Sequence, residues 1–337
     1  MRILICADAQ PLIGTGHLRR MLTLAGALSE ISGTNITVRT SELGHSIAAG
    51  AQLGMKVSIG SCSPADVAHT LMNSDFDIVI LDNYFWNATN ETQLRPYVKI
   101  ICVVDDLADR PHDADVLLDQ NAHHVPEDYD GLLPRHCERL VGGQYCLLGH
   151  AFTRLPTPAA PPHEGPVFVS LGGGDPHDDL PDVVSAIVET AGLPVTIATG
   201  SHIKSAETLR EIATKHTDTV ELIFNSREVA RQMQISSFAV AAGGTMIWER
   251  AAIGLPSLCM IVADNQVEST SWLKKREMHE VFDLRGDWSP EHLASRVIAL
   301  SKDNDRRETY AQNSRRLVAR DGAVRVARAL IDKFQQS

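Results

Sequence analysis

The chain has 337 residues, a length that favours two domains at about 150 residues each. Its formal net charge of −11 argues against non-specific nucleic-acid binding, because that binding needs a basic surface to displace counterions from phosphate. No run of about 18 apolar residues occurs, so we expect no membrane span. Met1 and Arg2 precede a short apolar run rather than a secretory signal, so we expect a first strand and a cytoplasmic protein.

The first half of the chain alternates short apolar runs with amphipathic stretches. Apolar residues at helical spacing predict a helix at 18–28. The apolar runs predict strands at 3–6, 36–38, 57–59, 78–81 and 100–104. Because continuous apolar runs are typical of strands covered on both faces, the pattern indicates an α/β fold with a parallel sheet.

The composition changes at residues 154–166, which hold five prolines. Proline fixes φ and donates no backbone hydrogen bond, so we interpret this segment as a semi-rigid linker. The predicted organisation is therefore a Rossmann-like domain at 1–153, the linker, a second Rossmann-like domain at 167–320, and a helix at 321–337 that packs back on the first domain.

After the linker the alternation of strands and helices starts again. We expect helices at 180–191, 205–216, 227–233 and 246–253, and a basic helical tail over 306–334. We expect strands at 167–171, 195–198, 221–224, 238–242 and 257–261, the last being the final clear strand. Open α/β sheets bind ligands beyond the carboxyl ends of their strands, so the loops there should face a cleft between the two halves.

The loop after the first strand contains Gly14 and Gly16 and opens the first helix at His17. Glycines let the backbone approach a ligand, and a helix N-terminus offers free N–H groups. The helix dipole disfavours a protonated imidazole, so His17 could accept a proton, and Arg20 lies one turn further on. Arg19 stands where a dinucleotide-binding loop has its third glycine. The alternative is that His17 caps the helix and Arg20 is solvated.

A second glycine loop follows the strand at 167–171. It contains Gly172, Gly173 and Gly174. Three glycines suit the approach of a phosphate, but a simple turn explains them equally well.

The loop after the strand at 238–242 carries a more specific pattern. Gly243, Gly244 and the Thr245 hydroxyl could hold a diphosphate without a metal, because a helix begins at Thr245. Glu249 lies one turn deeper on the same face and could accept both hydroxyls of a ribose. The alternative is that Thr245 is a plain N-cap and Glu249 pairs with Arg250 or a lysine.

Asn265 and Gln266 follow the strand at 257–261. Short polar side chains at a strand end can contact a ligand, and they are also ordinary in loops. Both interpretations stay open from the residues alone.

Other polar clusters favour structural roles. Asp105, Asp106 and Asp109 could hold magnesium, but acidic residues after a strand more often form turns and caps. His123 and His124 lack ligand partners at metal spacing, so we interpret them as solvated loop residues. No two cysteines have the Cys-x-x-Cys spacing. We therefore expect no metal and no cofactor.

Together these segments resemble the UDP-sugar hydrolases of the pseudaminic acid pathway, which have the two-domain GT-B fold. The residues that carry the resemblance lie at 8–20, 81–84, 104–121, 170–176, 242–249, 263–266 and 321–326. The resemblance covers most of the chain. It departs from the family pattern at Asn83, Gly149 and Ala151, which bears on the identity of the sugar more than on UDP.

The resemblance implies that the chain cleaves UDP from a diacetamido-trideoxy-altrose with water, with inversion at the anomeric carbon. It implies that His17 is the base and that Tyr84 lines the sugar site. It further implies that Gly243, Gly244, Thr245 and Glu249 hold UDP, and that Asn265 or Gln266 contacts the sugar or phosphate.

We also expect Gly14, Gly16, Arg20, Gly172 and Gly173 to line the substrate site. A small UDP-sugar is thus the predicted partner, and the oligomeric state is not predicted. Two other functions remain open. One is a glycosyltransferase of the same fold that uses a UDP-acetamido sugar, and the other is a catalytically silent nucleotide-sugar binding protein.

Overall fold

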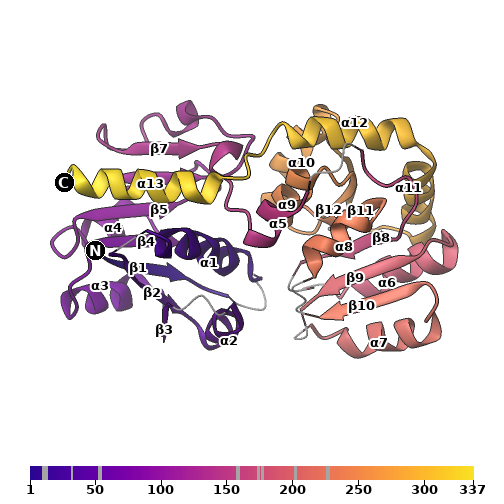
Figure 1. Ribbon diagram of the computed structural model, residues 1–337, viewed down its shortest axis with the longest axis horizontal. Helices are drawn as coiled ribbons and strands as arrows, with labels where there is room; N and C mark the ends of the chain where they lie inside the picture. The colour runs from indigo at the N-terminus through magenta and orange to yellow at the C-terminus, as the bar shows by residue number, and fades with distance from the viewer. Residues whose placement is uncertain are drawn as a thin grey trace. The chain divides into compact units, whose positions relative to one another are not determined.

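The computed structural model divides the chain into two compact units (Figure 1). Unit 1 comprises Met1–Gly149 and Ala319–Ser337, and unit 2 comprises His150–Val318. The division into domains at 1–153 and 167–320, with a linker at 154–166 and a final helix at 321–337, stays a prediction. The structure describes residues 1–9, 14–31, 33–51, 55–156, 160–172, 175, 178–200, 203–224 and 228–337, without the side chains of 49–51.

Unit 1 contains a seven-stranded parallel sheet in the order β3-β2-β1-β4-β5-β6-β7. The strand order reverses between β1 and β4, so the carboxyl ends of these two central strands mark the topological switch point of the sheet. The strands are β1 (Arg2–Ala7), β2 (Asn35–Thr40), β3 (Lys56–Ile59), β4 (Ile78–Asp82), β5 (Ile100–Val104), β6 (Val116–Asp119) and β7 (Glu138–Val141).

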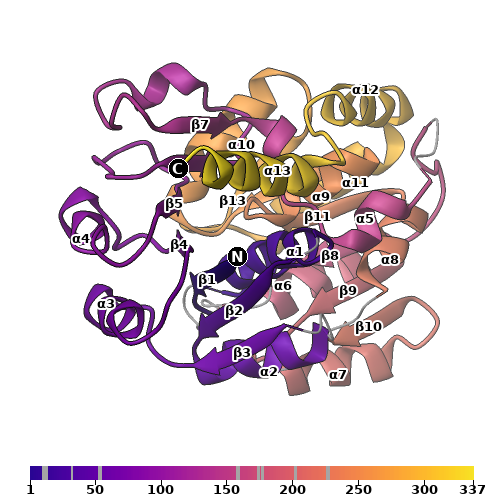
Figure 2. The ribbon, with the colours of Figure 1, turned by 60° about the vertical axis from the view of Figure 1, so that its left-hand side comes forward.

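The helices of unit 1 cover this sheet and include the last helix of the chain. They are α1 (Gly16–Ser29), α2 (Glu42–Ala51), α3 (Pro64–Met72), α4 (Ala88–Thr92), η1 (Pro126–Tyr129), η2 (Gly143–Tyr145) and α13 (Gly322–Gln335). Helix α13 lies beside α1 in both ribbon views (Figures 1 and 2). Its residues Val326, Ala327 and Leu330 are buried in the same core as Leu18.

Close approach of the backbone fixes the start of α13. A Cβ added at Gly322 would lie 2.3 Å from the carbonyl oxygen of Cys146. Only glycine fits there without a shift of the main chain.

Unit 2 contains a six-stranded parallel sheet in the order β10-β9-β8-β11-β12-β13. The strands are β8 (Val167–Ser170), β9 (Val195–Thr199), β10 (Val220–Phe224), β11 (Phe238–Ala242), β12 (Ser257–Ile261) and β13 (Glu280–Asp283). The prediction that residues 257–261 form the last strand was wrong. Strand β13 pairs with β12 at the edge of the sheet, where a strand of four residues with only two apolar side chains suffices.

The helices of unit 2 flank its sheet. They are α5 (His150–Arg154), α6 (Leu180–Ser185), the π-helical η3 (Ala186–Thr190), α7 (Ala206–Lys215), α8 (Val229–Ile235), α9 (Met246–Ile253), η4 (Asp264–Gln266), α10 (Val267–Lys275), α11 (Pro290–Lys302) and α12 (Asn304–Arg315). Part of the proline-rich segment lies against this unit. Arg307 Nη2 donates to the His163 carbonyl at 2.9 Å, and Ser237 Oγ donates to the Gly165 carbonyl at 3.1 Å.

The apolar runs of the sequence become the buried centres of both sheets. Every residue of β4, β5 and β11 is buried, as expected for central strands covered on both faces. The six cysteines are free thiols, and all except Cys137 are buried. Among the described residues, no helix combines the length and the apolar character that crossing a membrane requires.

Candidate functional site

The start of α1 lies beside the carboxyl end of β4, at the switch point of the sheet. Gly14 has φ +82°, a left-handed conformation that glycine adopts without strain, and Gly16 is the first residue of α1. The N-cap is Thr15, not His17. The alternative in which His17 merely caps the helix was therefore wrong.

His17 contacts the buried end of β4. Its Nδ1 lies 2.6 Å from Asp82 Oδ1, and the Asp82 side chain is fully buried. Asp82 is the last residue of β4 and pairs in register with Ala7 of β1. On another side, the Tyr84 ring meets the imidazole edge-on, with ring centroids 4.9 Å apart. The structure thus brings His17 and Tyr84 together, and their roles as base and sugar-site residue stay predictions.

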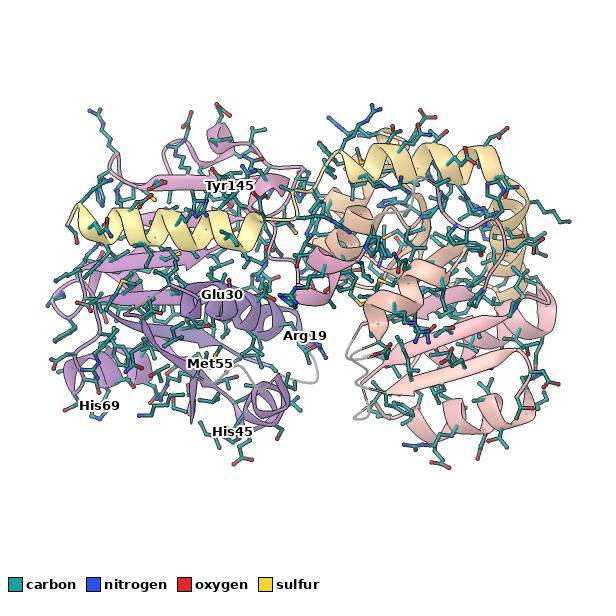
Figure 3. All side chains as sticks on the ribbon, viewed as in Figure 1. Arg19, Glu30, His45, Met55, His69 and Tyr145 are labelled. Atoms are coloured by element: carbon teal, nitrogen blue, oxygen red, sulfur yellow. The ribbon has the colours of Figure 1, made fainter. Side chains whose placement is uncertain are left out.

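Arg20 lies between two carboxylates under His17. Its Nε and Nη2 donate to the two oxygens of Asp82 at 2.7 and 2.6 Å, and its Nη1 and Nη2 donate to the two oxygens of Asp106 at 2.7 and 2.8 Å. The side chain is only 3% exposed, so the alternative of a solvated Arg20 was wrong. In contrast, the adjacent Arg19 is exposed near the start of the same helix (Figure 3). A direct contact between Arg20 and substrate stays a prediction.

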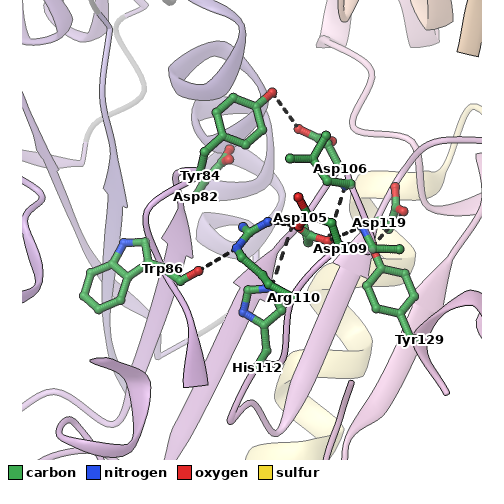
Figure 4. Close-up of polar contacts among 12 residues, drawn as sticks. Asp82, Tyr84, Trp86, Asp105, Asp106, Asp109, Arg110, His112, Asp119 and Tyr129 are labelled. Atoms are coloured by element: carbon green, nitrogen blue, oxygen red, sulfur yellow. Dashed lines mark hydrogen bonds and ion pairs between the residues drawn. The ribbon is translucent and has the colours of Figure 1, made fainter. Parts of the chain in front are cut away.

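The charge of Arg20 keeps both carboxylates ionised. Burial favours the neutral acid, but Arg20 outweighs it and lowers the pKa of Asp82 and of Asp106 below their usual range. Asp106 also accepts from Asn121 Nδ2 at 3.0 Å and from the Tyr84 hydroxyl at 3.5 Å (Figure 4). These acidic residues therefore form part of an internal ion-pair network.

A second carboxylate–histidine pair lies at the end of β6. His124 Nδ1 bonds Asp119 Oδ2. The Tyr129 hydroxyl lies 2.9 Å from Asp119 Oδ2 and 3.1 Å from Asp105 Oδ2 (Figure 4). His124 is buried, so its interpretation as a solvated loop residue was wrong. Its partner lies five residues earlier, on the preceding strand. Asp105 also accepts from the backbone N–H of Ala108 at 2.8 Å, which is the expected turn role.

A third carboxylate–histidine pair joins α4 to the segment between β5 and β6, where His112 Nε2 lies 3.9 Å from Asp105 Oδ1. His112 Nδ1 lies 2.7 Å from Glu91 Oε1, and Glu91 Oε2 accepts the backbone N–H of Asp113 at 2.7 Å. The side chains of Glu91 and His112 are fully buried.

The glycine loop of unit 2 joins β11 to α9. Thr245 stands at the N-cap of α9, with helical backbone angles and no capping bond through its side chain. The alternative in which Glu249 pairs with Arg250 or a lysine stays open. The Arg250 guanidinium points to the strand end. Its Nη1 and Nη2 both lie 3.1 Å from the Ala242 carbonyl oxygen. The predicted contact of Glu249 with ribose stays a prediction.

Arg250 is a site residue that sequence reasoning missed. It is buried, and its Nε also donates to Ser257 Oγ at 3.1 Å. Burial lowers its pKa. The guanidinium therefore fixes the last residue of β11, from which Gly243 and Gly244 depart. The sequence did not indicate this bond to the end of β11, because an arginine beside a glutamate on a helix is common on protein surfaces.

Gln266 packs beside the same loop. Its Oε1 accepts the backbone N–H of Val262 at 3.1 Å, and its carbonyl accepts the Thr270 hydroxyl at 2.6 Å. A Cβ added at Gly243 would lie 2.5 Å from Thr270 Cγ2, and one added at Gly244 would lie 3.9 Å from Gln266 Nε2. The structure thus brings Gly243, Gly244 and Gln266 together, with Asn265 on the adjoining η4.

This packing predicts a rescue. Gly243→Ala should lower the free energy of unfolding by about 1–3 kcal/mol, because the new methyl group overlaps Thr270 Cγ2. Thr270→Ser removes that carbon and keeps the hydroxyl that bonds Gln266. In urea unfolding of all four proteins, the double variant should therefore be more stable than additivity predicts. Strict additivity would contradict the packing.

The loop after β8 is described only in part. Gly172 has φ +101°, where only glycine avoids strain, and its N–H donates to Ser170 Oγ at 3.3 Å. Gly173 and Gly174 lie outside the described residues. Asp175 accepts the backbone N–H groups of Asp179 and Leu180 at 3.1 and 3.0 Å, so it supports the start of α6. Because β8, β11 and β12 are neighbours, their loops lie at one edge of the sheet.

Comparisons with known proteins bear on the fold of the chain and on its similarity to other sequences. No family model matches the chain. Solved structures align over nearly all of it. MurG from Acinetobacter baumannii gives a TM-score of 0.66 at 10% identity, covering 98% of this chain and 99% of that one. UGT71G1 from Medicago truncatula, complexed with UDP-glucose, gives 0.66 at 13% identity, covering 99% and 98%. The chain has the GT-B fold.

A curated relative is also similar in sequence. The UDP-2,4-diacetamido-2,4,6-trideoxy-beta-L-altropyranose hydrolase of Campylobacter jejuni is 24% identical over 281 residues, which cover 82% of this chain and 97% of that protein. The resemblance to this kind of hydrolase that the motifs indicated is therefore confirmed.

Proposed function

We propose that the protein hydrolyses a UDP-linked diacetamido-trideoxy sugar at the anomeric carbon and releases UDP and the free sugar with inversion. The similarity over 82% of the chain to the Campylobacter jejuni hydrolase supports this reaction. The pathway of pseudaminic acid biosynthesis, a cytoplasmic location and independence of metal are parts of the proposal.

The observation that carries the proposal is the position of His17. It stands at a strand-end loop on the N-terminus of a helix, with a buried carboxylate at 2.6 Å from one ring nitrogen. Such a ring can take a proton from a water molecule as that water attacks a sugar carbon. Tyr84 packs against it, which suits a residue that lines the sugar site.

In the proposed mechanism, unit 2 binds the leaving group. Backbone N–H groups of Gly243, Gly244 and the first turn of α9, together with the Thr245 hydroxyl, hold the diphosphate as its charge develops. Glu249 accepts the ribose hydroxyls. Asn265 or Gln266 contacts the sugar or phosphate, and Gly14, Gly16, Gly172 and Gly173 allow the backbone to approach the substrate.

The test is incubation of the protein with UDP-diacetamido sugars in ¹⁸O-labelled water without any acceptor. We expect UDP release, one ¹⁸O in the free sugar and none in UDP, because the bond between C1 and oxygen breaks. An absolute need for an acceptor would support the glycosyltransferase. Binding of UDP without turnover of any sugar in the panel would support the silent binding protein.

The same assay tests metal independence. Activity should persist in excess chelator, because N–H groups at a helix N-terminus neutralise the diphosphate. Loss of activity that magnesium restores would overturn this part and direct attention to Asp105 and Asp106.

A further inference from the structure

The side chains that contact the His17 ring bear on which of its two nitrogens carries the proton. Among the described residues of unit 1, three side chains contact the imidazole: Asp82 from the end of β4, Arg20 from α1 itself, and Tyr84 from the loop after β4. Asp82 and Arg20 both approach the same ring nitrogen. Nδ1 lies 2.6 Å from Asp82 Oδ1 and 3.1 Å from Arg20 Nη2.

These two contacts require opposite states of the ring. A proton on Nδ1 would be donated to Asp82, whereas a bare Nδ1 would accept from Arg20. Asp82 is ionised and holds no proton, since the charge of Arg20 lowers its pKa in spite of burial. A deprotonated Nδ1 would therefore direct its lone pair at a carboxylate oxygen 2.6 Å away. The lone pairs of the two atoms would repel each other. Arg20 Nη2 already donates to Asp82 at 2.6 Å and to Asp106 at 2.8 Å.

We infer that Asp82 is a positioning residue that holds the proton of His17 on Nδ1 and so leaves the lone pair of Nε2 for the water. Arg20 fixes the carboxylate by two parallel hydrogen bonds, one to each oxygen. Asp82 does not touch the reacting atoms. It acts through His17, and this role rests on the proposed function.

The deciding substitution is Asp82→Asn. An amide has one oxygen and one nitrogen, and the donors of Arg20 face both positions. With its oxygen toward Arg20 Nε, the amide presents its NH₂ group to His17 Nδ1, which then becomes an acceptor and moves the ring proton to Nε2. We expect kcat to fall about 10²–10⁴-fold, as for loss of a general base, with KM changed less than threefold.

The tautomer of His17 is the measurement that distinguishes this role from a purely structural one. Two-bond ¹H–¹⁵N spectra of the full chain labelled with ¹⁵N-histidine distinguish Nδ1–H from Nε2–H, and His17→Asn identifies the His17 signals. We expect Nδ1–H in the wild type and Nε2–H in Asp82→Asn. An Nε2–H wild-type ring would overturn the inference. So would an Asp82→Asn protein that keeps the Nδ1–H ring or full kcat.

Glu91→Gln is the matched control, because it alters a buried carboxylate–histidine pair of the same unit. It should change the His112 signals and leave the His17 tautomer and kcat unchanged. If Asp82→Asn fails to fold, the wild-type spectrum still decides the position of the proton. Because that spectrum needs no substrate, an Nδ1–H ring in a protein that releases no UDP would contradict the proposed function and not the ring geometry.

Discussion

Replacing His17 by Asn should lower kcat for UDP release about 10²–10⁴-fold, which is the usual contribution of a positioned general base. An amide has a similar size but cannot take up a proton near neutral pH. The diphosphate contacts are proposed for unit 2, so the affinity for UDP itself should stay within twofold of the wild type. Steady-state kinetics and calorimetric titration with UDP measure the two quantities.

His69→Asn is the control for this experiment. His69 lies on α3 and is exposed (Figure 3), and the same substitution there should leave kcat unchanged. A His17→Asn protein that hydrolyses substrate at the wild-type rate would exclude His17 as the base. A protein that loses UDP binding along with activity would indicate a role in folding or in binding instead.

Replacing Arg20 by Met should reduce the free energy of unfolding of unit 1 by about 3–5 kcal/mol, the range found when one partner of a buried ion pair is removed. The side chain of Met fills much of the space, but Asp82 and Asp106 lose the cation that compensates their burial. Hydrogen exchange of the backbone amides of β4 and β5 reports this loss for unit 1 alone.

Arg19→Met supplies the matched control on the same helix. Arg19 is exposed and donates to Thr15 Oγ1 at 3.2 Å, so its replacement should cost less than about 0.5 kcal/mol. Equal effects of the two substitutions would show that the buried network adds nothing to stability.

The effect of Arg20→Met should also depend on pH. The folded protein has a lowered pKa at Asp82 and Asp106, mainly through Arg20 acting against burial. The stabilisation is thus fully present above the unfolded value of about 3.9 and is lost as pH falls through the lower folded values. The difference between wild type and Arg20→Met should therefore shrink as pH falls below about 4, where the wild type loses this stabilisation.

Much of the fold could be predicted because the central strands are long apolar runs. β4 and β5 are buried over their whole length, and their runs at 78–81 and 100–104 stood out for that reason. β7 and β13 have four residues each, and half of those residues are charged. Pairing with an existing strand, rather than their own composition, makes them strands.

In the candidate site, the features that depend on neighbouring residues could be predicted, and the contacts between distant residues could not. The loop chemistry of Gly14, Gly16 and His17 was visible in the sequence because it is local. The partner of His17 was not, because Asp82 is 65 residues away and meets it only when β4 packs beside β1. Arg250 was missed for a related reason. Its acceptor is the backbone carbonyl of Ala242, and a pattern of side chains does not indicate such a bond.

The place of α13 affects how the protein is made. Unit 1 needs Val326, Ala327 and Leu330 to complete its core, yet these residues leave the ribosome after all of unit 2. During translation, unit 1 therefore cannot complete its core until α13 is synthesised, and the surface of α1 that α13 covers stays exposed until then. Unit 2 can complete its fold earlier. A stop codon just before Gly322 would consequently damage the part of the protein that was synthesised earliest.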